Sequence, residues 1–145
     1  MPTWTAEARQ FLEAHRVGHL ATSGVDGAPH VVPVCFACDD AAIYFVADEK
    51  PKRRPARELL RLRNLHVNPR AALVVDDYDD DWSRLAYLLV RGPAAIVDAA
   101  PAHAAALVRL RARYPQYVAM ALDDPERSPL LRLEPVRVTF WRATG

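Results

Sequence analysis

The residues with the clearest chemical potential lie between Lys50 and Arg63. This run holds seven basic side chains and one acid, Glu58, although the whole chain carries a formal net charge of only +1. Charge this concentrated in a nearly neutral chain indicates a localised anionic partner rather than a general polyanion-binding surface. The sequence therefore predicts an anion site here.

The second half of this run has the spacing of a short helix that starts at Arg57. A helix there would bring its free backbone donors close to the preceding cations, and this combination is typical of phosphate sites. The alternative is a solvated basic helix that packs only by its leucines. The predicted packing face comprises Leu59, Leu62 and His66, the polar face comprises Arg57, Arg61 and Asn64, and the preceding cations are Lys50, Lys52 and Arg53.

Other reactive residue types do not form a recognisable constellation. Cys35 and Cys38 form a Cys-x-x-Cys in an extended apolar run, which favours buried structural cysteines over a redox or zinc pair. The five histidines have no ligand spacing. Among them, His19 and His30 fall on neighbouring predicted strands, where a structural pair is expected. We therefore predict no metal site, catalytic triad or carboxylate pair.

An acidic loop over residues 76–81 precedes Trp82. We interpret the aspartates as a solvated loop that could meet the basic segment of a partner subunit. Trp82 could pack on a ligand or simply anchor the loop.

The elements that must position these residues are mostly strands. Apolar alternation and turn signals predict six strands, with an antiparallel meander formed by the first three. Helical spacing predicts three helices, a further turn over 116–122, and a bend at Gly92 and Pro93. The predicted strands are 17–23, 29–36, 42–47, 70–77, 84–97 and 130–141, and the predicted helices are 5–14, the segment after Arg57, and 101–113.

The composition limits the classes of protein to which this chain can belong. A chain of 145 residues with 51% hydrophobic and 26% charged residues is typical of one globular domain, here spanning residues 1–145. No apolar run approaches the ~20 residues of a membrane span, and the first residues do not resemble a signal peptide, so a cytoplasmic protein is expected. The basic run is short and lacks interleaved aromatics, which argues against nucleic acid as a partner. The predicted class is mainly β or α+β, a small antiparallel barrel with flanking helices.

Several of these segments, taken in order, resemble the split β-barrel flavin-binding superfamily typified by pyridoxamine 5′-phosphate oxidase. Within it, the chain is most similar to the actinobacterial branch that uses the deazaflavin coenzyme F-420. The segments that carry the resemblance are Gly-His-Leu-Ala-Thr at 18–22, Asp-Gly-Ala-Pro-His-Val-Val-Pro-Val at 26–34, Lys-Pro-Lys-Arg at 50–53, Arg-Leu-Arg-Asn-Leu at 61–65, Asn-Pro-Arg at 68–70, Asp-Trp at 81–82 and Leu-Val-Arg-Gly at 89–92.

The resemblance implies a six-stranded antiparallel split β-barrel, a homodimer with cofactor sites at the subunit interface, and hydride chemistry supplied by the coenzyme. FMN is the alternative cofactor, and a non-catalytic flavin- or heme-binding module is the alternative function. The implied site residues fall into three groups: Lys50, Lys52, Arg53, Arg61 and Asn64 for the phosphate and tail, Ala21, Thr22, Pro33, Val34 and Cys35 along the flat ring, and Trp82 from the partner subunit. The substrate would be a small electron-poor molecule.

Overall fold

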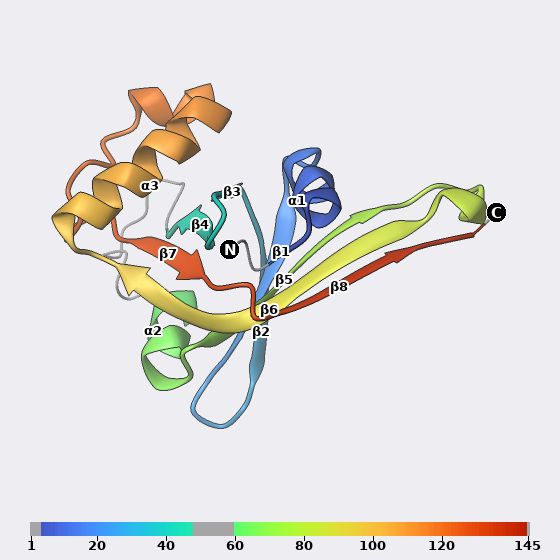
Figure 1. Ribbon diagram of the computed structural model, residues 1–145. Helices are drawn as coiled ribbons and strands as arrows, with labels where there is room; N and C mark the ends of the chain where they lie inside the picture. Colours follow the sequence, from blue (N-terminus) through green and yellow to red (C-terminus); the bar gives the residue numbers. More distant parts are fainter. Residues whose placement is uncertain (1–3, 48–59, 145) are drawn as a thin grey trace.

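The computed structural model describes residues 4–47 and 60–144, and these form three α-helices, two 3₁₀ turns and eight strands (Figure 1). The helices are α1 (Ala6–Glu13), α2 (Leu60–Val67) and α3 (Ala100–Arg113), and the 3₁₀ turns are η2 (Trp82–Arg84) and η3 (Pro115–Ala119). The strands are β1 (Gly18–Ser23), β2 (Pro29–Val34), β3 (Ala37–Cys38), β4 (Ile43–Val46), β5 (Arg70–Asp77), β6 (Ala86–Val97), β7 (Leu130–Leu133) and β8 (Arg137–Arg142).

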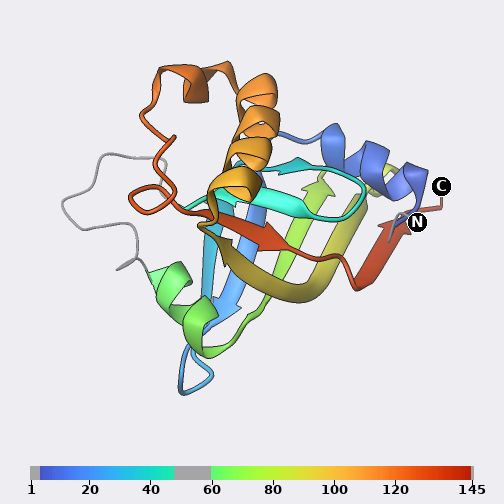
Figure 2. The same cartoon turned by 60° about the vertical axis from the view of Figure 1, so that its left-hand side comes forward.

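The strands make one curled antiparallel sheet, and β6 runs through both halves of this sheet. The hydrogen-bonded order is β2-β1-β5-β6-β7-β4-β3, and β8 pairs with β6 beside this path. The first half of β6 pairs with β5 and β8, whereas its second half pairs with β7. α3 contacts β3, β4 and β7, and it covers that end of the sheet in Figure 2. This is the predicted mainly β split-barrel architecture.

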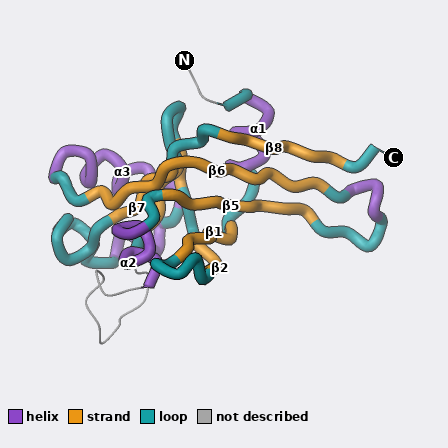
Figure 3. The backbone as a smooth tube through the Cα atoms, turned by 90° about the horizontal axis from the view of Figure 1, so that it is seen from below, coloured by secondary structure: helices purple, strands orange, loops and turns teal. Residues whose placement is uncertain are grey.

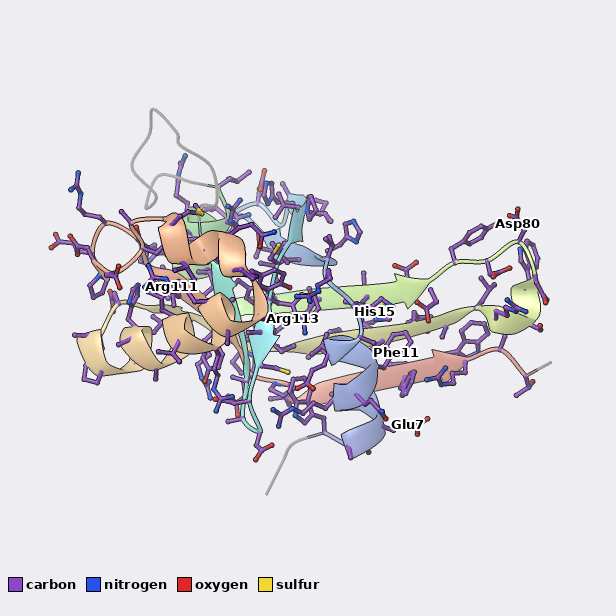
Figure 4. The ribbon with its side chains drawn as sticks, turned by 90° about the horizontal axis from the view of Figure 1, so that it is seen from above. Glu7, Phe11, His15, Asp80, Arg111 and Arg113 are labelled. Atoms are coloured by element: carbon purple, nitrogen blue, oxygen red, sulfur yellow. The ribbon has the colours of Figure 1, made fainter. Side chains whose placement is uncertain are left out.

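Three strands extend beyond the rest of the molecule as an arm. β5, β6 and β8 lie side by side in Figure 3 and run out to the η2 turn. α1 packs against this arm through Phe11, whose ring centroid lies 4.9 Å from that of Phe140 on β8. His15, just after α1, contacts the arm through Nε2, 2.6 Å from Oδ1 of Asp77 (Figure 4). α1 and the residues after it therefore pack against the arm and stabilise its position.

The prediction for α1 is confirmed in detail. The Thr5 hydroxyl accepts a hydrogen bond from the Ala8 amide, as expected for an N-cap, and the buried residues are Ala8, Phe11 and Leu12. These side chains join the main core, to which the first five strands, β6, β7 and α2 also contribute. A second cluster forms beneath α3 and η3.

The predicted number of strands was wrong, because one strand lies outside the predicted runs and one predicted run is divided. The run 29–36 ends as β2 at Val34, and β3 follows separately at Ala37–Cys38. The run 130–141 breaks between β7 and β8, where Pro135 supplies no backbone donor. The two parts of the latter run pair with different halves of β6, which no local pattern indicates.

The predicted three-strand meander is also only partly correct. β1 and β2 do form an antiparallel hairpin, with Gly27 at φ 79° in its turn. β4, however, pairs with β3 and β7 rather than with β2. β2 is therefore an edge strand of the sheet.

Both later helices bury faces that differ from the predicted ones. In α2, Leu62 is buried as expected, but His66 is exposed and Asn64 is 4% exposed. Asn64 can be buried because its side-chain amide donates a hydrogen bond to the buried hydroxyl of Thr22. In α3, Ala104 and Val108, which have helical spacing with Leu107 in the sequence, face solvent. The buried residues of α3 are His103, Ala106, Leu107 and Leu110.

The C-terminus of α3 is fixed by a polar junction. The Tyr114 hydroxyl accepts from the buried Phe36 amide at 3.0 Å and donates to the Arg16 carbonyl at 2.9 Å. Arg113 donates to the carbonyls of Glu13 and His15, and its guanidinium lies 5.0 Å from the Phe36 ring centroid. α3 is thereby tied to the segment between α1 and β1.

Candidate functional site

A pocket of about 750 Å³ opens on the face of the sheet that points away from the core. This volume lies within the range of small-molecule and cofactor sites. Its walls come from five strands (β1, β2, β5, β6 and β8) and from the connection that leads into β8. The lining comprises residues 21–23, Pro29, residues 70–72, residues 91–93, Val136 and Arg137.

The floor of the pocket follows from the strand register. Ala21 on β1 lies opposite Ala72 on β5, and Ala72 lies opposite Arg91 on β6. Arg91 lies in turn opposite Arg137 on β8. Residues directly opposite one another share a face of the sheet, so this row points outward together. The two alanines leave a low, flat apolar surface, and the two arginines stand at one end of it.

The end of β1 that borders the pocket is held by two asparagines of α2 and the segment after it. Asn64 Nδ2 donates to Thr22 Oγ1 at 3.0 Å, and both side chains are buried. Asn68 Nδ2 donates to the carbonyls of Ser23 and Gly24 at 3.1 and 2.7 Å. Because Thr22 Oγ1 accepts from Asn64, its own hydrogen is left to donate elsewhere. Asn64 thus positions Thr22.

Arg61 lies near the same end of the hairpin, on the core side. It donates to the carbonyl of Ala47. Burial lowers the pKa of His30, and the positive charge of Arg61 lowers it further. His30 lies opposite Thr22, whereas His19 lies opposite Pro33, so the two histidines point to opposite faces. The predicted pairing of His19 with His30 was therefore wrong.

The other predicted ring contacts lie elsewhere. Pro33 and Val34 pair with His19 and Gly18 at the far end of β1, outside the pocket lining. Cys35 follows β2 and packs against the core cluster beneath α3. The structure thus brings together Ala21, Thr22 and Asn64, with Arg61 nearby, and separates them from Pro33, Val34 and Cys35. Lys50, Lys52 and Arg53 lie outside the described residues.

Trp82 lies far from the pocket of its own chain. It belongs to η2, is 69% exposed, and sits beyond the distal end of the arm, next to Asp80, which Figure 4 marks at the tip. Between Ala72 and Asp77 alone, β5 spans about 17 Å. Trp82 therefore cannot contribute to this pocket within one chain.

The outward face of the arm is largely apolar, and we call it the outer face. Val74 lies opposite Leu89, and the Tyr87 ring stacks on that of Trp141 with centroids 5.8 Å apart. Trp141 is 43% exposed. α1 contacts the arm from the opposite side, through Phe140. Large exposed apolar faces of this kind mark interaction sites.

The cysteines have the structural character that the sequence predicts. Neither cysteine is in a disulfide; Cys35 lies between β2 and β3, and Cys38 is buried in β3. Burial, together with the nearby carboxylate of Glu13, raises the pKa of the Cys38 thiol to about 11. A thiol that resists ionisation is a poor nucleophile and a poor metal ligand.

The Cys38 pKa predicts a loss of stability at alkaline pH. The unfolded chain loses the thiol proton near the ordinary pKa of 9.0, while the native state keeps it up to about 11. The free energy of unfolding should therefore fall as the pH rises through this window. Urea unfolding at several pH values should show a shallower decline for Cys38→Ala than for wild type. Cys35→Ala is the matched control, and equal declines in all three proteins would contradict the prediction.

Of the pocket lining, the sequence predicted only Ala21 and Thr22 as site residues, and Arg70 and Gly92 entered only as members of family motifs. Arg91 was recognised only as part of a family motif. The usable signal was the alternation of β6, which places Arg91 on the face opposite Val90. The break before β8, which brings Arg137 beside Arg91, had no local signal.

No group of His, Cys, Asp and Glu side chains within residues 4–47 and 60–144 is arranged to hold a metal ion. In the same part of the chain, no helix combines the length and apolarity needed to cross a membrane.

Comparison with solved structures places the fold among known proteins. A conserved hypothetical protein from Mycobacterium tuberculosis superposes with a TM-score of 0.78 at 24% identity, covering 97% of this chain and 85% of the other. A structure described as F-420 reductase has a TM-score of 0.62 at 28% identity, covering 85% of this chain and 88% of that one. The heme storage protein HutZ from Vibrio cholerae, at 18% identity and a TM-score of 0.71, covers 94% and 89% and shows the fold alone.

A curated relative matches part of the chain. The 5a,11a-dehydrotetracycline/5a,11a-dehydrooxytetracycline reductase of Streptomyces rimosus is 36% identical over 76 residues, which cover 51% of this chain and 49% of the relative. The match thus spans about half the length of the relative. The family model described as Pyridoxamine 5'-phosphate oxidase matches residues 4–142. Because that match covers nearly the whole chain, the protein belongs to this family of split-barrel oxidoreductases.

Proposed function

We propose that the protein is an F-420-dependent reductase, which acts in the cytoplasm as a homodimer on a small electron-poor molecule. The observation that carries the proposal is the outward pocket with its flat alanine floor and cationic rim. A planar ring fits such a floor, because the methyl groups of Ala21 and Ala72 rise little above the sheet. The F-420 reductase at 28% identity favours F-420 over FMN, and the dehydrotetracycline reductase at 36% identity favours a reductase.

The residues of the chain would bind, orient and shield the coenzyme. Thr22 is proposed as a contact through the end of β1 that borders the pocket, which its buried hydrogen bond from Asn64 holds in place. Lys50, Lys52 and Arg53 are proposed to hold the phosphate, with Arg61 beside them. The reduced deazaflavin, when bound, supplies the hydride. Pro33, Val34 and Cys35 remain proposed contacts for parts of the coenzyme that extend along the β1–β2 hairpin.

A second subunit would complete the site. The pocket opens on the apolar outer face, so a partner seated there would exclude water from it. The distance between Trp82 and the pocket of its own chain fits a role in the pocket of the partner. The indole would then pack on the coenzyme or the substrate.

The coenzyme can be tested by fluorescence titration with oxidised F-420 beside FMN. We expect wild type to prefer F-420, and we expect Lys52→Ala to weaken binding by roughly tenfold or more, as for loss of a charge-assisted hydrogen bond. Arg127→Ala, an exposed arginine in the turn before β7, is the matched control and should bind as wild type does.

Other results of this titration would change or overturn the proposed function. Tighter binding of FMN would overturn the choice of coenzyme and leave an FMN-dependent oxidoreductase of the same family. Binding without substrate-dependent oxidation of the reduced coenzyme would indicate a non-catalytic carrier. Binding of neither compound would overturn the proposed function.

A further inference from the structure

Three arginines surround the pocket without a compensating acid in its lining. Arg70, Arg91 and Arg137 are exposed, and all three line the pocket. The remaining lining residues are apolar or neutral. Within the described part of the chain, ion pairs involve other arginines, and none is formed by these three. The ion-paired arginines are Arg9, Arg84, Arg109, Arg111 and Arg142.

Strand register forces the three charges onto one side of the sheet. Arg91 lies directly opposite Arg137 in the β6–β8 pair. Arg70 lies two residues before Ala72, the partner of Arg91, so it points to the same face. Like charges directly opposite in an antiparallel pair are destabilising. The chain carries this cost at the edge of the apolar pocket, where a bound anion would remove it.

Guanidinium groups select a particular ligand chemistry. Each offers a planar fork of donors that matches the two oxygens of a carboxylate or the oxygens of a phosphate. Two forks side by side, with Arg70 opposite Pro93 on the same face, can hold one such group together. An aromatic or apolar body attached to it would extend over the ring that is proposed to lie on Ala72 and Ala21.

These arginines are separate from Arg61, which is proposed to lie beside the coenzyme phosphate. α2 reaches β1 from the core side, where Asn64 bonds to Thr22 and Arg61 lies near His30. Arg91 and Arg137 project from the opposite side of the sheet. Arg61 on one side and Arg91 with Arg137 on the other suit two different anionic groups.

We infer that Arg70, Arg91 and Arg137 bind a carboxylate or phosphate group of the substrate, so that the reducible molecule is an organic anion. This inference rests on the proposed function, in which the pocket holds a substrate together with the coenzyme. The three arginines would then determine the chemical class of the substrate and the side of the pocket at which its anionic group binds.

The inference can be tested with simple anions. NMR titrations of ¹⁵N-labelled protein with inorganic phosphate and with succinate should shift amides around Gly92 and Arg137. In the double variant Arg91→Gln/Arg137→Gln, we expect the dissociation constants to rise at least ~10-fold, the loss of charge-assisted bonds. Arg127→Gln should leave them unchanged, and added salt should weaken wild-type binding.

A parallel titration with F-420 and FMN separates the substrate from the coenzyme. The double variant should bind its coenzyme within about threefold of wild type, since a tenfold change would correspond to a lost contact. An equal loss for coenzyme and simple anions would show that the arginines hold the coenzyme phosphate and would overturn the inference. Unchanged anion binding in the double variant would overturn it as well. If wild type binds neither coenzyme, the proposed function fails, while the anion titration still decides whether the arginines form an anion site.

Discussion

Replacement of Gly92 by alanine is expected to lower the free energy of unfolding by about 3 kcal/mol, the upper range for overpacking. A Cβ at this position would overlap the carbonyl oxygen of Glu134 and lie 3.1 Å from the amide nitrogen of Val136. Both obstacles are backbone atoms, and the chain is fixed there, since the Val136 amide donates to the Arg91 carbonyl and the Glu134 amide to the Pro93 carbonyl. Urea unfolding followed by circular dichroism measures the loss.

A second glycine provides the contrast for this experiment. Gly27 has φ 79° and no neighbour within 4 Å of an added Cβ. Gly27→Ala should therefore cost only the backbone strain of a left-handed residue, about 1 kcal/mol. If Gly92→Ala unfolds no earlier than Gly27→Ala, the connection between β7 and β8 is free to move and the steric account is wrong.

Placing a charge at Leu89 is expected to abolish the proposed dimer. Leu89 is half-buried on the outer face, opposite Val74 and Thr139. An aspartate there would lose its water if a partner covered the face, and an unpaired buried charge costs several kcal/mol. Light scattering after gel filtration should show monomers for Leu89→Asp at concentrations where wild type is dimeric. The affinity for F-420 should fall by about tenfold or more, because the partner subunit would no longer cover each pocket.

Val118→Asp is the matched control for this variant. Val118 is 65% exposed on η3, away from the outer face, and its replacement should change neither mass nor affinity. Circular dichroism should show that Leu89→Asp keeps its fold, since Leu89 points away from the core. A wild-type protein that is monomeric throughout, or a Leu89→Asp variant that stays dimeric, would rule out this face as the interface.

The fold was predictable wherever local patterns determine it. Thr5 caps α1, Asp26 and Gly27 turn the first hairpin, and the alternation over 70–77 is that of β5. The errors arose where pairing is non-local. Nothing near β4 in sequence indicates that its partner is β7. Likewise, the break at Pro135 was hidden within an apparently continuous apolar run.

The site was harder to predict because it is defined by cross-strand register. Ala21 and Thr22 came from the family resemblance, and Asn64 proved to act on Thr22 from a buried position. Arg137 joins Arg91 only because β8 returns along β6 in one register. A one-residue slip would turn Arg137 to the other face.

The sharing of β6 between two halves of the sheet has a consequence for how the chain folds during synthesis. β5 and β6 are adjacent in sequence and can pair as soon as both leave the ribosome, whereas β4 must wait for β7, since Ile43 pairs with Leu133. Until the last strands emerge, β4 and the backbone groups of β6 that later pair with β7 and β8 stay unpaired and are exposed to other nascent chains. Late closure of distant contacts slows folding and favours aggregation. The yield of folded protein should therefore depend on chaperone capacity more steeply than its final stability would suggest.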